Sequence, residues 1–450
     1  MSAGSLSRGL GLALGLWACT SGPGTDLTDE PVDTGGDTDQ PPTLDERLAE
    51  LLALTDPLVT AVDPPPSLDP DLVEVGRLLF FDPILSGNKD VACATCHDAE
   101  HGLSDGLPLT LGTGARGRGP ARAQGDHPPW GRRRAPALWG RHRLDALFWD
   151  GRVQVATDGV SAPLPLPAGG EALSLLAVQA LHPILDRAEM LGKSGDTTID
   201  GQANELAILD EPAAIYQAIE DRLRAIEGYD SRLTALNESW SMVEVVGALG
   251  AYQTVTFDAS DSRWDRYLRG ATDALTGEEK LGATFFFADG RCVSCHAGPA
   301  LTDQAFHNIG LQPVGPVVDI GREAVTGDPD DRFGFRTPPL RNVATQQPLT
   351  HNGTLLDLEA ITVHYADPEG RRASLDHLAS DIVVIDDEAV LRDLVNRLAP
   401  EMPLASSGVT TVGLSNIRVF LGALTDQSAV DRSREVPSSV PSGLTVGGGG

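Results

Sequence analysis

Apolar residues recur at helical spacing in several separate stretches of the chain. Between residues 69 and 81 the apolar positions 72, 75, 78 and 79 fall on one side of a helix. Between residues 212 and 226 they return every four positions behind a proline suited to a first turn. Thr276 and Glu279 have the spacing of a capping box. Further helices are predicted at residues 243–252, 276–287, 387–398 and 414–424. The pattern predicts a mainly α protein.

Three long stretches between these helices have no sustained period and are rich in Gly, Pro and Arg. They cover residues 104–136, 156–171 and 309–340. Loops this long inside a compact protein are usually functional or surround something. A large flat cofactor is one such thing.

A weak internal repeat divides the chain. Each copy has an apolar helix ending in Phe-Phe, a short turn, Cys-x-x-Cys-His, and then Leu-Ser/Thr-Asp. The copies are Phe80-Phe81, residues 93–97 and Leu103-Ser104-Asp105, and Phe286-Phe287, residues 292–296 and Leu301-Thr302-Asp303. The repeat predicts two related domains, at residues 46–240 and 241–428, followed by a tail at 429–450.

The first residues have the layout of an export signal. Arg8 precedes an apolar stretch from Leu10 to Trp17, and Ala18 stands directly before Cys19. The sequence Leu-Trp-Ala-Cys also resembles a lipobox, although tryptophan is unusual there, so a lipid anchor on Cys19 is expected. Residues 20–45 are predicted to be a flexible linker. No other apolar run approaches the roughly 18 residues needed to span a bilayer. These features predict a periplasmic protein, free or tethered.

The chain is strongly acidic, with 64 acidic and 34 basic residues and a formal charge of -30. This argues against nucleic acid or an anionic membrane surface as a partner. A basic protein partner would be attracted, although an acidic surface also serves solubility alone.

Four of the five cysteines form two Cys-x-x-Cys pairs, and a histidine follows each pair. The residues are Cys93, Cys96 and His97, and Cys292, Cys295 and His296. In this motif the two thiols bond one haem and the histidine binds its iron. A disulfide framework, a thioredoxin-like pair and a shared zinc site are the alternatives. The histidine in both copies favours two covalently bound haem c groups.

A sixth iron ligand decides whether a haem passes electrons or binds oxygen species. Spacing alone leaves the ligands open among ten histidines and four methionines.

From about residue 68 to 428 the chain resembles the di-haem cytochrome c peroxidase and MauG superfamily, closer to its MauG-type branch. The supporting stretches are GRLLFFDPILSG (76–87), FWDGR (148–152), residues 179–190, EEKLGATFFFADGRCVSCH (278–296), FHNIGL (306–311), FRTPPLRNV (335–343), and THNG (350–353) followed by His-Tyr at 364–365. The resemblance implies two cytochrome c-like helical domains, each with an attached haem, and peroxide chemistry at the first.

At the first haem the resemblance places Thr113 where the peroxidase branch can have a displaceable distal histidine, which implies an open iron. His127, in an insertion, is an alternative ligand. Gln179 and Glu189 match the distal Gln and Glu, with Pro183 between them. A carboxylate there moves a proton between peroxide oxygens and an amide orients the peroxide. Without the resemblance, a solvent-facing polar helix is the simpler interpretation.

Two aromatic residues are implied at the second haem. Trp149 matches an indole between the haems that relays electrons, although a tryptophan before Asp-Gly is often a packing anchor. Tyr365, twelve residues after Gly353, stands where the peroxidase branch has a methionine ligand and MauG-type members have tyrosine. A phenolate ligand favours the ferric and higher oxidation states of iron. Tyr365 as mere packing is the alternative.

Members of the superfamily often hold calcium between the haems. Arg134 stands at the position of the asparagine ligand, while Gln346 and Pro348 match the carbonyl donors. Arginine cannot coordinate a cation, so the sequence argues against calcium unless water or a shifted loop completes a site.

The sequence therefore predicts an oxidoreductase that reduces hydrogen peroxide at the N-terminal haem and passes oxidising equivalents through the second haem to an electron donor such as a small cytochrome. One alternative is MauG-like oxidation of side chains on a partner protein. Another is a non-enzymatic electron-transfer cytochrome.

Overall fold

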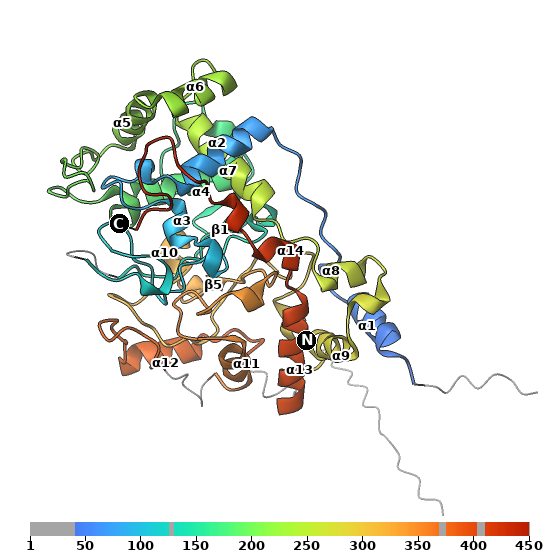
Figure 1. Ribbon diagram of the computed structural model, residues 1–450. Helices are drawn as coiled ribbons and strands as arrows, with labels where there is room; N and C mark the ends of the chain where they lie inside the picture. The colour runs from blue at the N-terminus through green and yellow to red at the C-terminus, as the bar shows by residue number, and fades with distance from the viewer. Residues whose placement is uncertain (1–40, 126–129, 369–374, 403–409, 450) are drawn as a thin grey trace, which may run out of the picture. The chain divides into compact units, whose positions relative to one another are not determined.

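Helices dominate the computed structural model, which describes residues 41–125, 130–368, 375–402 and 410–449 (Figure 1). From Pro42 onward the described residues form one compact unit. The predicted export signal, Cys19 and His127 lie outside the described residues. Among those that are described, no helix is both long and apolar enough to cross a membrane.

The helices follow one another along the chain with long connections. They are α1 (Leu44–Leu52), α2 (Pro70–Phe81), α3 (Cys93–Cys96), α4 (Leu175–Leu185), α5 (Pro212–Arg224), α6 (Glu227–Leu236), α7 (Met242–Thr256), α8 (Arg263–Leu268), α9 (Gly277–Phe287), α10 (Glu323–Thr326), α11 (Leu358–Ala366), α12 (Glu388–Asn396), α13 (Thr411–Ala423) and α14 (Gln427–Val430). All six predicted helices are confirmed, including the capping box before α9. Seven further helices of the described chain had not been predicted: α1, α4, α6, α8, α10, α11 and α14.

Strands are few and short. An antiparallel sheet joins β1 (Ala146–Leu147), β2 (Val153–Ala156) and β3 (Gly159–Ser161) in that order. A second pair joins β4 (Phe306–His307) to β5 (Phe335–Arg336), with Phe306 opposite Arg336. The second pair joins residues just before the predicted loop at 309–340 to residues near the end of that loop, and this is where the candidate site is built.

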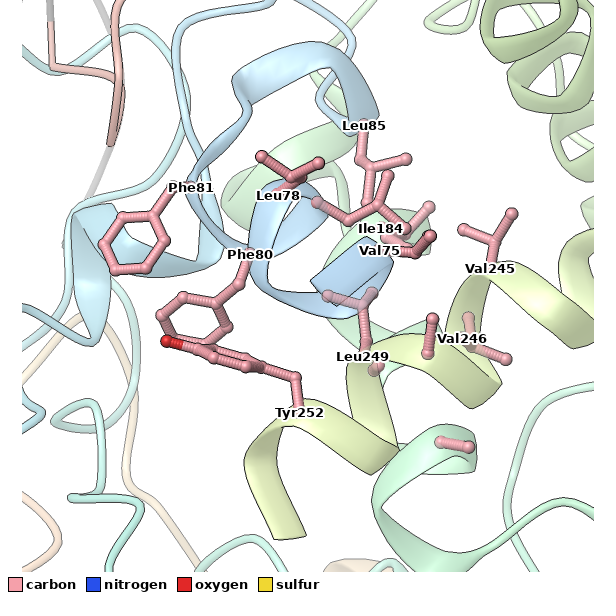
Figure 2. Packing of buried hydrophobic residues seen from close by; sticks show 14 of the residues in the cluster. Val75, Leu78, Phe80, Phe81, Leu85, Ile184, Val245, Val246, Leu249 and Tyr252 are labelled. Carbon is pink, nitrogen blue, oxygen red and sulfur yellow. The ribbon is translucent and has the colours of Figure 1, made fainter. Parts of the chain in front are cut away.

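The first core lies where α2 crosses α7, with α4 beside them (Figure 2). The two helices approach closely because Gly76 has no side chain: a Cβ atom there would lie 1.9 Å from the carbonyl oxygen of Ala248. Phe80 packs against Tyr252 with ring centroids 5.3 Å apart. Burial of each such large apolar side chain contributes roughly 1.5–3 kcal/mol.

The second core repeats this construction with α9 and α13. A Cβ atom on Gly282 would lie 2.0 Å from the carbonyl oxygen of Asn416. Trp264 on α8 meets Phe420 edge to face at 4.9 Å. Gly76 and Gly282 each stand four residues before the Phe-Phe pair of their repeat. Both copies of the repeat thus use a glycine to admit the partner helix.

The packing of α1 and α7 does not follow the predicted boundary between the two domains. The sequence places it near residue 240, which assigns α7 to the second half, but α7 supplies much of the first core. The sequence also assigns α1 to the first half, yet Leu48 of α1 is buried in the second core against α9. Apolar spacing identifies a helix but does not say which core its apolar face meets.

The segment predicted as a tail from residue 429 is folded onto the first core. Val440 is buried there, and Ser442 donates a hydrogen bond from its hydroxyl to Asp82 at 2.6 Å. In Figure 1 this segment is the red end of the chain, which returns beside the blue α2. The segment has few apolar residues, and many of its contacts are made by its backbone. The sequence pattern therefore did not indicate that it folds onto the core.

Candidate active site

Both Cys-x-x-Cys-His motifs form a helical turn that fixes the ring of their histidine. The Nδ1 atom of His97 lies 3.2 Å from the carbonyl oxygen of Leu103, and that of His296 lies 2.9 Å from the carbonyl oxygen of Leu301. Both leucines have the left-handed backbone conformation that turns this carbonyl inward. Since a carbonyl only accepts, Nδ1 carries the proton and Nε2 is left to bind a metal.

Burial favours the neutral, ligand form of both histidines. It lowers the pKa of His97 to about 4 and lowers the pKa of His296. Burial also raises the pKa of Cys93 and Cys96 to about 12, unlike the activated thiols of redox pairs.

The alternatives for the cysteines find no support in this geometry. All four cysteines of the motifs are free. In the described part of the chain the two Cys-x-x-Cys pairs do not meet in a metal cluster; the one group with metal-ligand types is Cys295, Asp303 and His307. A zinc site shared between the pairs is therefore not formed.

The repeat extends beyond the motif recognised in the sequence. The hydroxyl of Ser104 donates to the carbonyl of Ala135 at 2.8 Å, and the hydroxyl of Thr302 donates to that of Thr337 at 2.7 Å. Each carbonyl belongs to an Arg-x-Pro-x-Leu stretch, residues 134–138 and 336–340. Each proximal histidine is thus tied to an equivalent arginine segment.

The arginines of these stretches test whether a haem fits. The side chains of Arg134 and Arg336 are 2% and 1% exposed. In the described chain, Nε and Nη2 of Arg134 and Nη2 of Arg336 have no hydrogen-bond partner. Burial lowers the pKa of both to about 10. The acidic neighbour of Arg134 is Asp105, and burial raises the pKa of this carboxyl to about 6. Buried cations are normally paired. The carboxylates of a haem supply this missing partner, so the residues fit the group.

A cavity surrounds the second Cys-x-x-Cys-His motif. Its walls include His296, Tyr365, Trp149, Arg134 and Met402. Tyr365 stands on α11, and burial next to the thiols of the second motif raises its pKa. The structure thus brings Tyr365 into the same cavity as His296, and it also brings in Met402, which the sequence had not singled out.

At the first motif, α4 and the turn after it present Gln179 and Glu189. Pro183 has no N–H, so the backbone carbonyl of Gln179 lacks its helical partner. No hydrogen bond of the Gln179 side chain is found within the described residues. A π-helical turn follows at Arg187–Leu191, and its N-terminus is held by Asp186, which accepts from the backbone of Glu189 at 3.0 Å.

Glu189 lies near enough to the first motif for its charge to contribute to the raised pKa of Cys96. Burial, followed by the nearby charge of Asp186, raises the pKa of Glu189 to about 7. A carboxyl with this pKa exchanges a proton readily at neutral pH.

Trp149 lies between the two arginine segments. Its indole donates to the carbonyl of Arg134 at 2.9 Å, and its own carbonyl accepts from the backbone of Arg336 at 2.8 Å. The ring of His351 meets it edge to face at 6.4 Å, and both rings line the second cavity. The structure therefore connects Trp149 to the histidine segments of both repeats.

Only two of the three residues matched to a calcium site line the cavity. Arg134 and Gln346 line the cavity of the second motif, whereas Pro348 is not among the residues that line it. Arg134 brings a cation to this place rather than an oxygen ligand.

The sequence reasoning missed several residues of this region. Arg336 could have been found, because it repeats Arg134 in an Arg-x-Pro-x-Leu stretch. His351 belongs to the Thr-His-Asn-Gly stretch at residues 350–353, but no role was predicted for it. Asp186 carries no sequence signal, since its carboxylate bonds only backbone N–H groups.

Comparison with known proteins agrees with this geometry. The family model described as di-haem cytochrome c peroxidase matches residues 70–273. The methylamine utilization protein MauG of Methylorubrum extorquens is 30% identical over 314 residues, which cover 68% of this chain and 72% of that protein. The cytochrome c551 peroxidase of Pseudomonas aeruginosa is 30% identical over 291 residues, covering 64% and 69%.

Two solved structures share the fold. A MauG-like protein associated with microbial copper homeostasis has a TM-score of 0.59 and 24% identity, over 84% of this chain and 97% of that one. The di-haem peroxidase BthA of Burkholderia thailandensis has a TM-score of 0.55 and 23% identity, over 83% and 91%. At this identity the structures show the fold alone. The sequence relatives establish the class: the chain belongs to the di-haem cytochrome c peroxidase and MauG family, whose members are oxidoreductases acting on peroxide.

Proposed function

We propose that the protein reduces hydrogen peroxide at its first haem site and passes the oxidising equivalents to a second site that stores them. The observation that carries the proposal is Glu189, a carboxyl with a pKa of about 7 beside the first Cys-x-x-Cys-His turn. Two haem c groups, held by the two motifs, would supply the redox chemistry when bound.

Glu189 performs the proton transfer in this proposal. Its carboxylate takes a proton from one peroxide oxygen and returns it to the other, so that water leaves. Overall, one peroxide, two electrons and two protons give two water molecules. The amide of Gln179, which has no partner among the described residues, orients the peroxide. Pro183 and Asp186 keep the two groups in place.

Trp149 serves as the relay between the sites. Its buried indole is fixed by Arg134 and its backbone by Arg336, so the ring keeps one orientation between the two histidine segments. Tyr365 would hold the iron of the second haem together with His296, since the two residues line one cavity. A hard phenolate there favours stored oxidising power over easy reduction.

The final reductant is an electron-donor protein, such as a small cytochrome, or side chains of a partner protein in MauG-like chemistry. Tyr365 and Thr113 favour the second mechanism. We place the protein in the periplasm, with a lipid anchor on Cys19 as an alternative to a free form. Family membership argues against the non-enzymatic carrier.

Stopped-flow addition of peroxide to the fully ferric protein with both haems separates these functions. A long-lived state two oxidising equivalents above the resting protein supports storage and MauG-like chemistry. Reactivity that appears only after one-electron reduction supports an ordinary peroxidase. Two low-spin six-coordinate sites that peroxide leaves unchanged would contradict both.

A further inference from the structure

Asp90, three residues before the first Cys-x-x-Cys-His motif, joins three segments that are distant in sequence. Its backbone carbonyl accepts from Gly449 at 2.9 Å. Its carboxylate accepts from the hydroxyl of Thr113 at 2.7 Å and from the backbone of Gly114 at 2.6 Å. Hydrogen bonds to a carboxylate are among the stronger ones in proteins.

The segment 447–449 lies along the haem-attachment turn itself. Thr95, inside the first motif, is fully buried and donates from its hydroxyl to the carbonyl of Gly447 at 2.6 Å. Val91 pairs with Gly448 in an antiparallel bridge. The far end of the chain is therefore part of the wall beside the first motif.

Thr113 passes this contact on to the catalytic turn. Its backbone N–H donates to the carbonyl of Glu189 at 2.8 Å. Next to it, a Cβ atom on Gly112 would lie 1.9 Å from the carbonyl oxygen of Ala188, so the two backbones are in direct contact. Arg122 holds the other side of this loop by donating to the carbonyls of residues 111, 112 and 117.

We propose that Asp90 and the segment 447–449 form a clamp that positions Glu189 at the first haem site, with Asp90 as a positioning residue. The clamp acts through Thr113 on the π-helical turn 187–191 and leaves the second site untouched. The role in proton transfer rests on the proposed function of Glu189, whereas the mechanical contact does not.

A matched pair of glycine substitutions tests the clamp. Gly448 and Gly443 both have a positive φ, of +65° and +73°. A Cβ atom on Gly448 would meet the carbonyl oxygen of Asp90 at 2.5 Å and Thr95 at 2.8 Å, whereas on Gly443 it meets nothing within 4 Å. Gly448→Ala therefore disturbs the clamp, and Gly443→Ala imposes the same backbone strain without doing so.

Hydrogen exchange of the protein with both haems is the first measurement. We expect Gly448→Ala and Asp90→Asn to speed exchange in residues 187–191 about tenfold or more, as loss of a charged hydrogen bond predicts. Gly443→Ala should match the wild type. Thr113→Val should act like Asp90→Asn, and Thr113→Ser should restore the wild-type rate. Wild-type exchange in both Gly448→Ala and Thr113→Val would overturn the clamp.

The pH dependence of the peroxide reaction is the second measurement. A loosened turn admits water to Glu189, so the midpoint near pH 7 should fall by about one unit in Asp90→Asn. If hydrogen exchange in residues 187–191 becomes faster but the pH midpoint of the peroxide reaction stays unchanged, Asp90 has no positioning role for Glu189. If Glu189→Gln itself leaves the peroxide reaction unchanged, the proposed function fails, while the exchange data still decide whether the clamp exists.

Discussion

The two Cys-x-x-Cys-His sites are built from the same repeat but surrounded by different side chains. Each has a histidine held by a leucine carbonyl, an Arg-x-Pro-x-Leu stretch and a glycine that admits a partner helix. Around the first, a carboxyl of raised pKa and an amide without a partner in the described chain are held in place by backbone contacts. Around the second, Tyr365 shares a cavity with the histidine. The repeat thus builds the same scaffold twice, and in the proposed function the residues added around each copy divide the chemistry.

Removing the carboxyl at the first site should have the largest effect. In Glu189→Gln the side chain keeps its shape but no longer transfers a proton, so the peroxide reaction should slow by about 10²–10⁴-fold. The rate is measured by stopped-flow on the fully ferric protein. The spectrum of the second site should stay unchanged, and the exposed Glu238→Gln serves as control. A normal rate in Glu189→Gln would remove the basis for the difference between the sites.

The pH dependence sharpens the same point. Burial raises the pKa of Glu189 to about 7, so the carboxylate that takes the first proton is scarce below this pH. The peroxide rate should rise about tenfold per pH unit below pH 7 and level off above it. Glu189→Gln should lose this dependence. A midpoint near 4.5, the ordinary value for glutamate, would show that the site is open to water.

Substitution of Tyr365 tests the role proposed for the second site. Tyr365→Phe should shorten the lifetime of the oxidised state by roughly tenfold, because it removes the phenolate that favours the higher oxidation states of iron. Optical spectra after a peroxide pulse measure this decay. An absorption band at about 700 nm in the variant would show that Met402 takes the vacated position. The same band in the wild type would contradict the assignment of Tyr365.

The paired glycines compare the two cores. Gly76→Ala and Gly282→Ala each place a methyl group within 2.0 Å of a backbone carbonyl. Each should lower the free energy of unfolding by about 1–3 kcal/mol. Gly247→Ala, on the α7 helix that packs against α2, has nothing within 4 Å of its Cβ and should be neutral or slightly stabilising. Denaturant titration measures all three, and equal losses for the first two indicate equivalent crossings.

Calcium removal should have the smallest effect. Because Arg134 brings a buried cation to the cavity instead of an oxygen ligand, a chelator should leave the spectra and the peroxide rate of the wild type unchanged. Calcium analysis of the purified protein is the independent check. A chelator-induced spectral change would show that other oxygen atoms complete a site.

The sequence by itself determined the two Cys-x-x-Cys-His motifs, the repeat and the principal helices, because these depend on local spacing. Cys-x-x-Cys-His fits on one helical turn, and the apolar period of α2 or α9 is visible in a single stretch. The roles of Glu189, Trp149 and Tyr365 came from resemblance, since no local pattern distinguishes them from packed or solvent-facing residues.

Only the tertiary structure decided which segments meet. It placed α7 in the first core and α1 in the second, which an apolar face on a helix does not by itself specify. It placed Trp149 between Arg134 and Arg336, which are about two hundred positions apart. It also brought segment 447–449 to Asp90 through backbone hydrogen bonds, which any residue can make and which therefore leave no trace in the sequence.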